Sequence, residues 1–122
     1  MKGDIMSEIT NSILNSTKRF IGGISENDTS FDVEIIAHIN TVISTLRQMG
    51  VGPKEGYSIK DASNTWTDYL GDSKILDSVK TYIGLKTRLI FDPPTNSAVA
   101  EAIKANIAEL EWRLNITGET NL

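Results

Sequence analysis

Apolar residues recur at intervals of three and four along two stretches in the second half of the chain, which is the spacing of one helix face. The first stretch covers residues 73–91 and is interrupted by Lys86, and the second covers residues 97–114. Pro93 and Pro94 lie between them and end the first helix, because proline lacks the backbone N–H that a helix interior needs. So short a connection predicts two antiparallel helices that pack stripe against stripe and form the core.

The same spacing predicts two helices in the first half of the chain. Residues 5–20 carry a loose stripe among many Asn, Ser and Thr residues, whose side chains compete for backbone groups and lower helix propensity. Residues 31–49 carry a tighter and wider stripe, with Thr29 or Ser30 as the expected cap. A wide apolar face indicates burial against more than one neighbour. The sequence therefore predicts an all-α fold, a small bundle of four principal helices.

The helical pattern breaks between residues 50 and 72, which leaves a long loop between the second and third principal helices. A short helical turn is expected at 65–70. Long loops are uncommon inside a compact domain unless they have a function or are held in place. Aromatic residues with a polar tip suit that purpose, whether they fill the chain's own core or meet a neighbouring subunit. The candidate subunit-contact residues, including one aromatic from the last helix, are Tyr57, Trp66, Tyr69 and Trp112.

Composition is that of an ordinary globular domain and narrows the range of partners. A chain of 122 residues fits one domain spanning 1–122, and its 39% hydrophobic and 23% charged residues are near the usual values. With no cysteine and no apolar run of about eighteen residues, neither a disulfide framework nor a membrane span is expected. The net charge of -4 argues against general adhesion to nucleic acid, which needs clustered Lys and Arg.

No catalytic, cofactor-binding or metal-binding site can be assembled from the residue pattern. His38 is the one histidine, and it lies in a predicted helix without an identifiable partner. Four aspartates between residues 61 and 77 match no calcium-binding loop, and capping and turns explain them better. The glycine-rich turn at 50–53 lacks the Gly-Lys-Ser/Thr of a phosphate-binding loop. The residues alone therefore indicate a binding or structural protein and not an enzyme.

Several motifs resemble those of the head–tail connector proteins of tailed phages. The most specific part is a Phe-Asp-Pro-Pro junction followed by a helix that ends in Glu-Trp-Arg-Leu-Asn. The resemblance covers most of the chain from residue 31 onward. The segments that carry it are 31–36, 39–40, 46–53, 66–70, 80–86, 89–94 and 111–115.

This resemblance implies a structural viral protein. Such proteins are small and helical and form a homo-oligomeric ring, expected here to be dodecameric, beneath the capsid portal. The ring extends the DNA channel and docks neck and tail completion proteins, so the implied partners are the portal protein, these completion proteins and further copies of the chain. Genomic DNA would pass through without specific binding, and no membrane is involved. The implied location is the head–tail junction of the virion, after synthesis in the cytoplasm of the host bacterium.

Two physical arguments agree with this implication. An anionic channel wall repels phosphate, whereas a basic wall would hold the DNA. A closed ring also needs heterologous contacts, in which one face of each subunit meets a different face of the next. The wide helix faces and the long aromatic loop are suitable sources of those two surfaces.

The last residues form a short polar segment beyond the last apolar repeat. We expect a flexible tail at 116–122 that the core does not need. In proteins that resemble this one such ends reach towards the portal, and the two apolar residues of this segment suit ordering by a partner. The portal-docking candidates are Ile116, Thr117, Gly118, Glu119, Thr120, Asn121 and Leu122.

Two other classes of protein remain open from the sequence. A small helical regulatory nucleic-acid-binding protein should show a basic recognition helix after a tight turn, whereas the helices predicted here are mixed or acidic. An acidic helical metal or enzyme domain would need a set of convergent ligands, which the carboxylates could supply only through folding.

Overall fold

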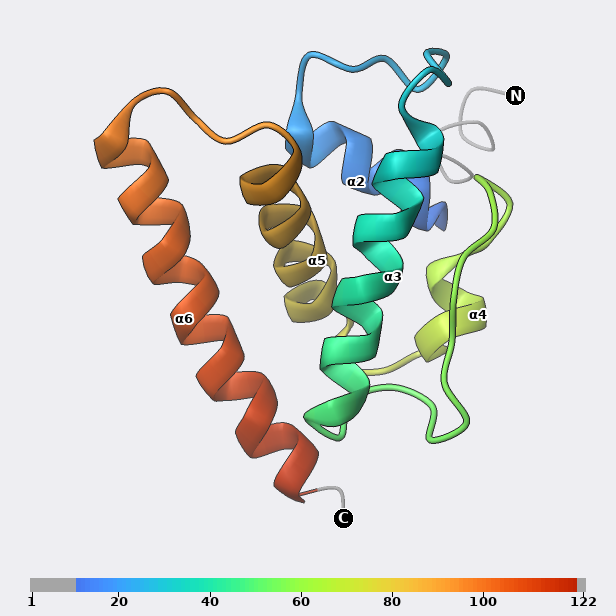
Figure 1. Ribbon diagram of the computed structural model, residues 1–122. Coiled ribbons are helices and arrows are strands. Elements are labelled where there is room, and N and C mark those ends of the chain that lie inside the picture. The colour runs from blue at the N-terminus through green and yellow to red at the C-terminus, as the bar shows by residue number, and fades with distance from the viewer. Residues whose placement is uncertain (1–10, 121–122) are drawn as a thin grey trace.

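The computed structural model describes residues 11–120 of the chain. Helices are the regular secondary structure of these residues, which contain no β-strand, so the predicted all-α fold is confirmed (Figure 1). The five helices are α2 (Ile13–Ile21), α3 (Asp32–Gln48), α4 (Trp66–Leu70), α5 (Leu76–Phe91) and α6 (Ser97–Thr120). The first four of the predicted segments correspond to α2, α3, the short α4 turn and α5.

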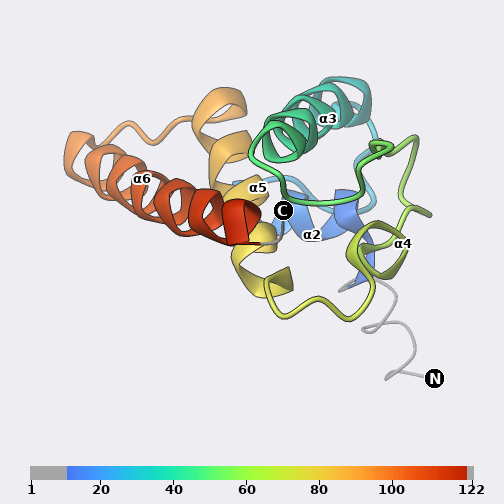
Figure 2. The same ribbon diagram turned by 90° about the horizontal axis from the view of Figure 1, so that it is seen from below.

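α5 is the central helix of the bundle. It contacts α2, α3 and α6, and Figure 1 shows it between α3 and α6. Figure 2, which looks along the bundle from below, shows α2 on the side of α5 away from α6. The side chains of Val79, Tyr82 and Ile83 on α5 are fully buried. These side chains are buried because α5 packs against three neighbouring helices.

The predicted hairpin of α5 and α6 is present, but it is not the whole core. The buried cluster also takes side chains from α2, α3, α4 and the long loop, whereas α6 covers one outer side of α5. Ile103, Ile107 and Leu114 make the buried stripe of α6. Tyr82 Oη donates a hydrogen bond of 2.9 Å to Glu111 Oε2, and burial together with this carboxylate raises the pKa of Tyr82.

The first predicted helix, 5–20, is interrupted at Ser12, and its expected start lies outside the described residues. The backbone at Ser12 is extended (φ -74°, ψ 125°), so α2 begins at Ile13. Ser12 Oγ accepts a hydrogen bond from the backbone N–H of Asn15 and donates one of 2.7 Å to the carbonyl oxygen of Ala62. Ile13 N–H donates to the carbonyl oxygen of Asn64. The loop thus takes the N–H of Ile13, which a continuous helix would use for its own hydrogen bond.

The start of α3 also differs from its prediction. Neither Thr29 nor Ser30 is its cap, because the capping position is Phe31, which gives no side-chain hydrogen bond. A buried cation fixes this helix start instead. Lys18 Nζ, on a side chain that is 1% exposed, lies 2.6 Å from Asp32 Oδ1 and 2.9 Å from the carbonyl oxygen of Asp28. The charge of Lys18 therefore joins α2 to the first turn of α3.

The long loop is held against α3 by Asn40. Its side-chain amide accepts the N–H of Ile59 at 2.8 Å and donates to the carbonyl oxygen of the same residue at 3.0 Å. This pairing replaces the two hydrogen bonds that Ile59 would make to a neighbouring strand. It fixes the loop while Ile59 itself is buried at 2% exposure.

Candidate functional site

The aromatic residues proposed as subunit contacts have different environments. Trp66 and Tyr69 are buried at 1% and 3% exposure in the chain's own core, where Trp66 Nε1 donates to Ser16 Oγ. Tyr57 is half-buried and stacks on Tyr69, with ring centroids 5.0 Å apart. Trp112 on α6 is 65% exposed. Of the four, Trp112 therefore offers the most surface to a neighbouring subunit.

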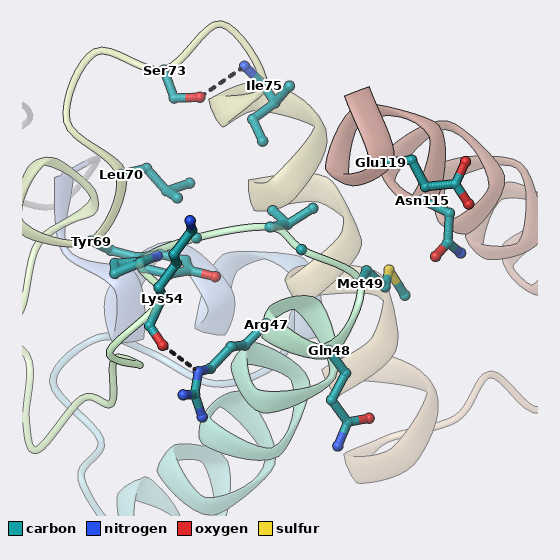
Figure 3. A pocket seen from close by; sticks show the side chains of 14 residues that line it. Arg47, Gln48, Met49, Lys54, Tyr69, Leu70, Ser73, Ile75, Asn115 and Glu119 are labelled. Carbon is teal, nitrogen blue, oxygen red and sulfur yellow. Dashed lines mark hydrogen bonds between the residues drawn. The ribbon is translucent and has the colours of Figure 1, made fainter. Parts of the chain in front are cut away.

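A groove of about 850 Å³ opens where the ends of α3 and α6 meet the long loop (Figure 3). Three segments that are far apart in the sequence build it. They are 47–54 from the end of α3 and the start of the loop, 69–75 from α4 and the connection to α5, and the last turns of α6. Its walls carry both apolar and polar side chains. The lining residues are Arg47, Gln48, Met49, Gly50, Val51, Gly52, Pro53, Lys54, Tyr69, Leu70, Ser73, Ile75, Asn115 and Glu119.

The loop wall of the groove carries two cationic side chains. Arg47 Nε donates to the carbonyl oxygen of Lys54 at 2.9 Å, which holds the turn at 50–54 against the end of α3. Both side chains are exposed. Gly52 has a positive φ of 96°, and a Cβ there would also lie 3.1 Å from the ring of Tyr69. The turn therefore approaches the tyrosine as closely as it does because residue 52 has no side chain.

Tyr69 brings a buried polar atom to this groove. Its hydroxyl is inaccessible and forms no hydrogen bond within the described residues. Burial raises the pKa of Tyr69 above its ordinary value. Figure 3 shows Tyr69 among the side chains that line the groove. A buried hydroxyl without a hydrogen-bond partner is costly to the folded state.

The α6 wall of the groove corrects the prediction for the C-terminal tail. The last helix was expected to end at 114, but α6 continues to Thr120. Gly118 is buried, and a Cβ built on it would overlap the carbonyl oxygen of Met49. Of the portal-docking candidates, 116–120 are therefore helical, and Asn121 and Leu122 lie outside the described residues. The spacing of four from Leu114 to Gly118 continues the apolar stripe, but glycine in a sequence reads as a helix end.

We expect Gly118→Ala to lower the free energy of unfolding by about 1–3 kcal/mol, because the added methyl group must displace the backbone at Met49. On helix propensity alone the same change would stabilise an exposed helix by roughly 1 kcal/mol. The sign of the effect in urea denaturation therefore tests the close contact. A stabilised Gly118→Ala variant would show that the end of α6 does not pack against α3.

The residues considered for catalysis or metal binding do not converge. His38 faces the ring of Phe91, with centroids 6.4 Å apart. Asp61 accepts hydrogen bonds from the N–H and hydroxyl of Ser63, which lower the pKa of this carboxyl and assign it to a turn. Between residues 11 and 120, no group of three or more His, Asp or Glu side chains is placed to hold a metal ion.

Comparison with known proteins identifies the family. The family model described as phage connector protein matches residues 13–121. No curated protein and no solved structure matches the chain. Within the described part of the chain, none of the helices is both long and apolar enough to cross a membrane. Because the family model covers nearly the whole sequence, the chain belongs to the phage connector protein family and has a structural role at the head–tail junction of the virion.

Proposed function

We propose that this connector protein assembles into a closed ring beneath the capsid portal, extends the DNA channel, and docks the portal on one side and neck or tail completion proteins on the other. Membership of the connector family is the observation that carries this proposal. The resemblance to head–tail connector proteins supplies the expected twelve-fold ring. Genomic DNA passes through this ring without being held.

The outer side of α6 is a candidate for further burial on assembly. Trp112 and Ile116 lie four residues apart on this side and are 65% and 43% exposed. Large apolar side chains exposed together on one face are typical of an interaction surface. Trp112 is the larger of the two, and tryptophan is enriched among the residues that dominate binding energy in interfaces. It is our first candidate for a subunit contact outside the groove.

The charge balance supports passage of DNA without binding. The chain has 16 acidic and 12 basic residues. Part of the basic charge is also committed within the fold, because the amine of Lys18 is buried beside Asp32. A ring of such subunits presents a net anionic surface to phosphate, and binding to nucleic acid requires the opposite.

The end of α6 is our candidate for portal docking. Ile116 and Glu119 are exposed there, whereas Gly118 is committed to the contact with Met49. Because 116–120 are already helical, binding through this segment would not require the ordering of those residues. Ile116 then supplies apolar area to the portal contact, and Glu119 lines the neighbouring groove.

Attachment to capsids that carry the portal but lack this protein tests the docking proposal. We expect Ile116→Ser to weaken attachment by about tenfold, the scale of removing one buried aliphatic side chain. Val99→Ser is the matched control, since Val99 has nearly the same exposure at the other end of α6. Equal attachment by both variants would contradict portal docking by the end of α6. Electron microscopy of the purified protein and of the loaded capsids tests ring formation itself.

A further inference from the structure

One end of the molecule carries an exposed apolar tip. We define this tip by Phe31, Val33 and Ile90, which are 41%, 83% and 53% exposed. The start of α3 and the end of α5 lie at the same end of the bundle in Figure 1. The ring of Phe31 packs edge-on against Phe91, with centroids 5.5 Å apart, so the two helix ends form one surface. Exposed apolar groups gathered in this way favour burial by a partner.

Carboxylates accompany the apolar side chains of the tip. Glu34 follows Val33 in the first turn of α3, and Asp92 follows the end of α5; both are exposed. Asp32 does not add to this outward charge, because it is paired with the buried Lys18. Arg88 also lies in the last turn of α5, but it is partly buried. The exposed side chains of the tip are therefore apolar and anionic.

The groove at the other end of α3 has the complementary character. Arg47 and Lys54 supply positive charge on its loop wall, and Met49, Val51 and Pro53 supply apolar surface. Glu119 on the α6 wall is the one acidic side chain among the described residues that line it. The volume of about 850 Å³ lies within the range of pockets that enclose whole ligands, so it has room for several side chains.

We propose that the groove receives the apolar tip of a second copy of this chain, with Val33 and Phe31 inserted and Glu34 or Asp92 facing Arg47 and Lys54. The inference rests on the proposed ring and names the two surfaces that join its subunits. Charge complementarity between the two ends of one molecule favours this occupant over a portal segment. The tip and the groove are different surfaces, so the contact is heterologous and passes from each copy to the next.

The positions of the two surfaces suit a large ring. They lie at opposite ends of α3, which runs the length of the bundle in Figure 1. In a ring of about twelve subunits each copy is rotated by about 30° from the last, so its two contact surfaces must lie on nearly opposite sides. A contact between copies of the same patch would close a dimer and leave the other end unused.

Self-association of the full chain, measured by mass photometry and sedimentation across protein concentration, tests this contact in solution. Cooperative loading onto portal-bearing capsids tests it in the assembly, and each variant below is measured in both ways. We expect Val33→Ser to weaken self-association by about tenfold, while unfolding changes little because the side chain is exposed. Lys54→Glu and Glu34→Lys should each weaken it by about threefold to tenfold. The two changes combined should restore association to within about threefold of the wild type, because they exchange the charges across the interface.

Two control variants separate this contact from others. Lys104→Glu makes the same charge change as Lys54→Glu at an exposed position of α6, where the side chain pairs only with Glu101 at 3.5 Å, and it should leave association unchanged. Trp112→Ala tests the outer side of α6. Loss of association in Trp112→Ala, with Val33→Ser unaffected, would overturn the tip-in-groove contact in favour of α6.

The remaining outcomes separate this inference from the ring proposal. If Lys54→Glu weakens attachment to capsids but not loading between copies, the groove holds a segment of the portal and the inference is wrong. The inference is also wrong if Val33→Ser forms rings normally and if the combined Glu34→Lys and Lys54→Glu variant associates no better than the single variants. The ring proposal stands in that case. A wild-type chain that stays monomeric both in solution and on capsids contradicts the ring proposal itself.

Discussion

Replacing Asp32 with alanine is expected to lower the free energy of unfolding by about 3–5 kcal/mol, because it leaves the buried charge of Lys18 without its carboxylate. Lys18 is 1% exposed, and its remaining contact is the carbonyl oxygen of Asp28. The loss should appear in urea denaturation as a lower midpoint with an unchanged slope. The same change would loosen the start of α3, where the apolar tip begins.

A neighbouring ion pair gives the matched control for Asp32→Ala. Arg19 Nε lies 3.0 Å from Glu26 Oε1, and the two side chains are 46% and 32% exposed. Because water already solvates both charges, Glu26→Ala should cost less than about 1 kcal/mol. Similar losses from the two variants would mean that the charge of Lys18 reaches solvent and that the pair does not organise the helix start.

Helix positions were predictable because apolar spacing is a local property of the sequence. On the stripes of α3, α5 and α6, Ile39, Val79 and Ile107 lie in the core. The stripes extend too far at two helix ends, where Ile90 and Val99 are 53% and 42% exposed. What the spacing did not give is the number of neighbours that each stripe meets. α5 packs against three helices, whereas α6 packs mainly against α5, and both sequences read as ordinary amphipathic helices.

The errors of prediction fall where a distant backbone group decides the local structure. Ser12 interrupts the helix because two hydrogen bonds hold this point to the loop. The hydroxyl of Ser12 donates to the carbonyl oxygen of Ala62, and the N–H of Ile13 donates to that of Asn64. Asn40 lies on α3, and its side-chain amide holds both backbone groups of Ile59 in the long loop. These contacts join segments far apart in the sequence, and no spacing within one helix reveals them.

The groove could be predicted only in part. The long loop and Tyr69 were identified as features with either a core or an interface role, and both contribute to its walls. Its other wall needs α6 to continue to residues 115–119, and a tail was expected from residue 116. Gly118 is the cause of that error, because the close contact with Met49 uses a residue without a side chain and leaves no apolar signal.

Leu114→Ala is expected to lower the free energy of unfolding by about 2–5 kcal/mol, because it opens a cavity in the contact of α6 with the rest of the bundle. Leu114 is 1% exposed and lies one helical turn before Gly118, so its loss also weakens the wall of the groove.

Trp112 is the matched control for Leu114, since it lies two residues earlier on the same helix and is 65% exposed. By size alone Trp112→Ala removes the larger side chain, but burial predicts a change in unfolding free energy of less than about 0.5 kcal/mol. Denaturation at several protein concentrations separates the stability of one chain from that of an assembly, since only the latter depends on concentration. A larger loss for Trp112→Ala at the lowest concentration would show that α6 packs with its other face inward. A loss that grows with concentration would instead place Trp112 in a contact between subunits, the role that its exposure suggests.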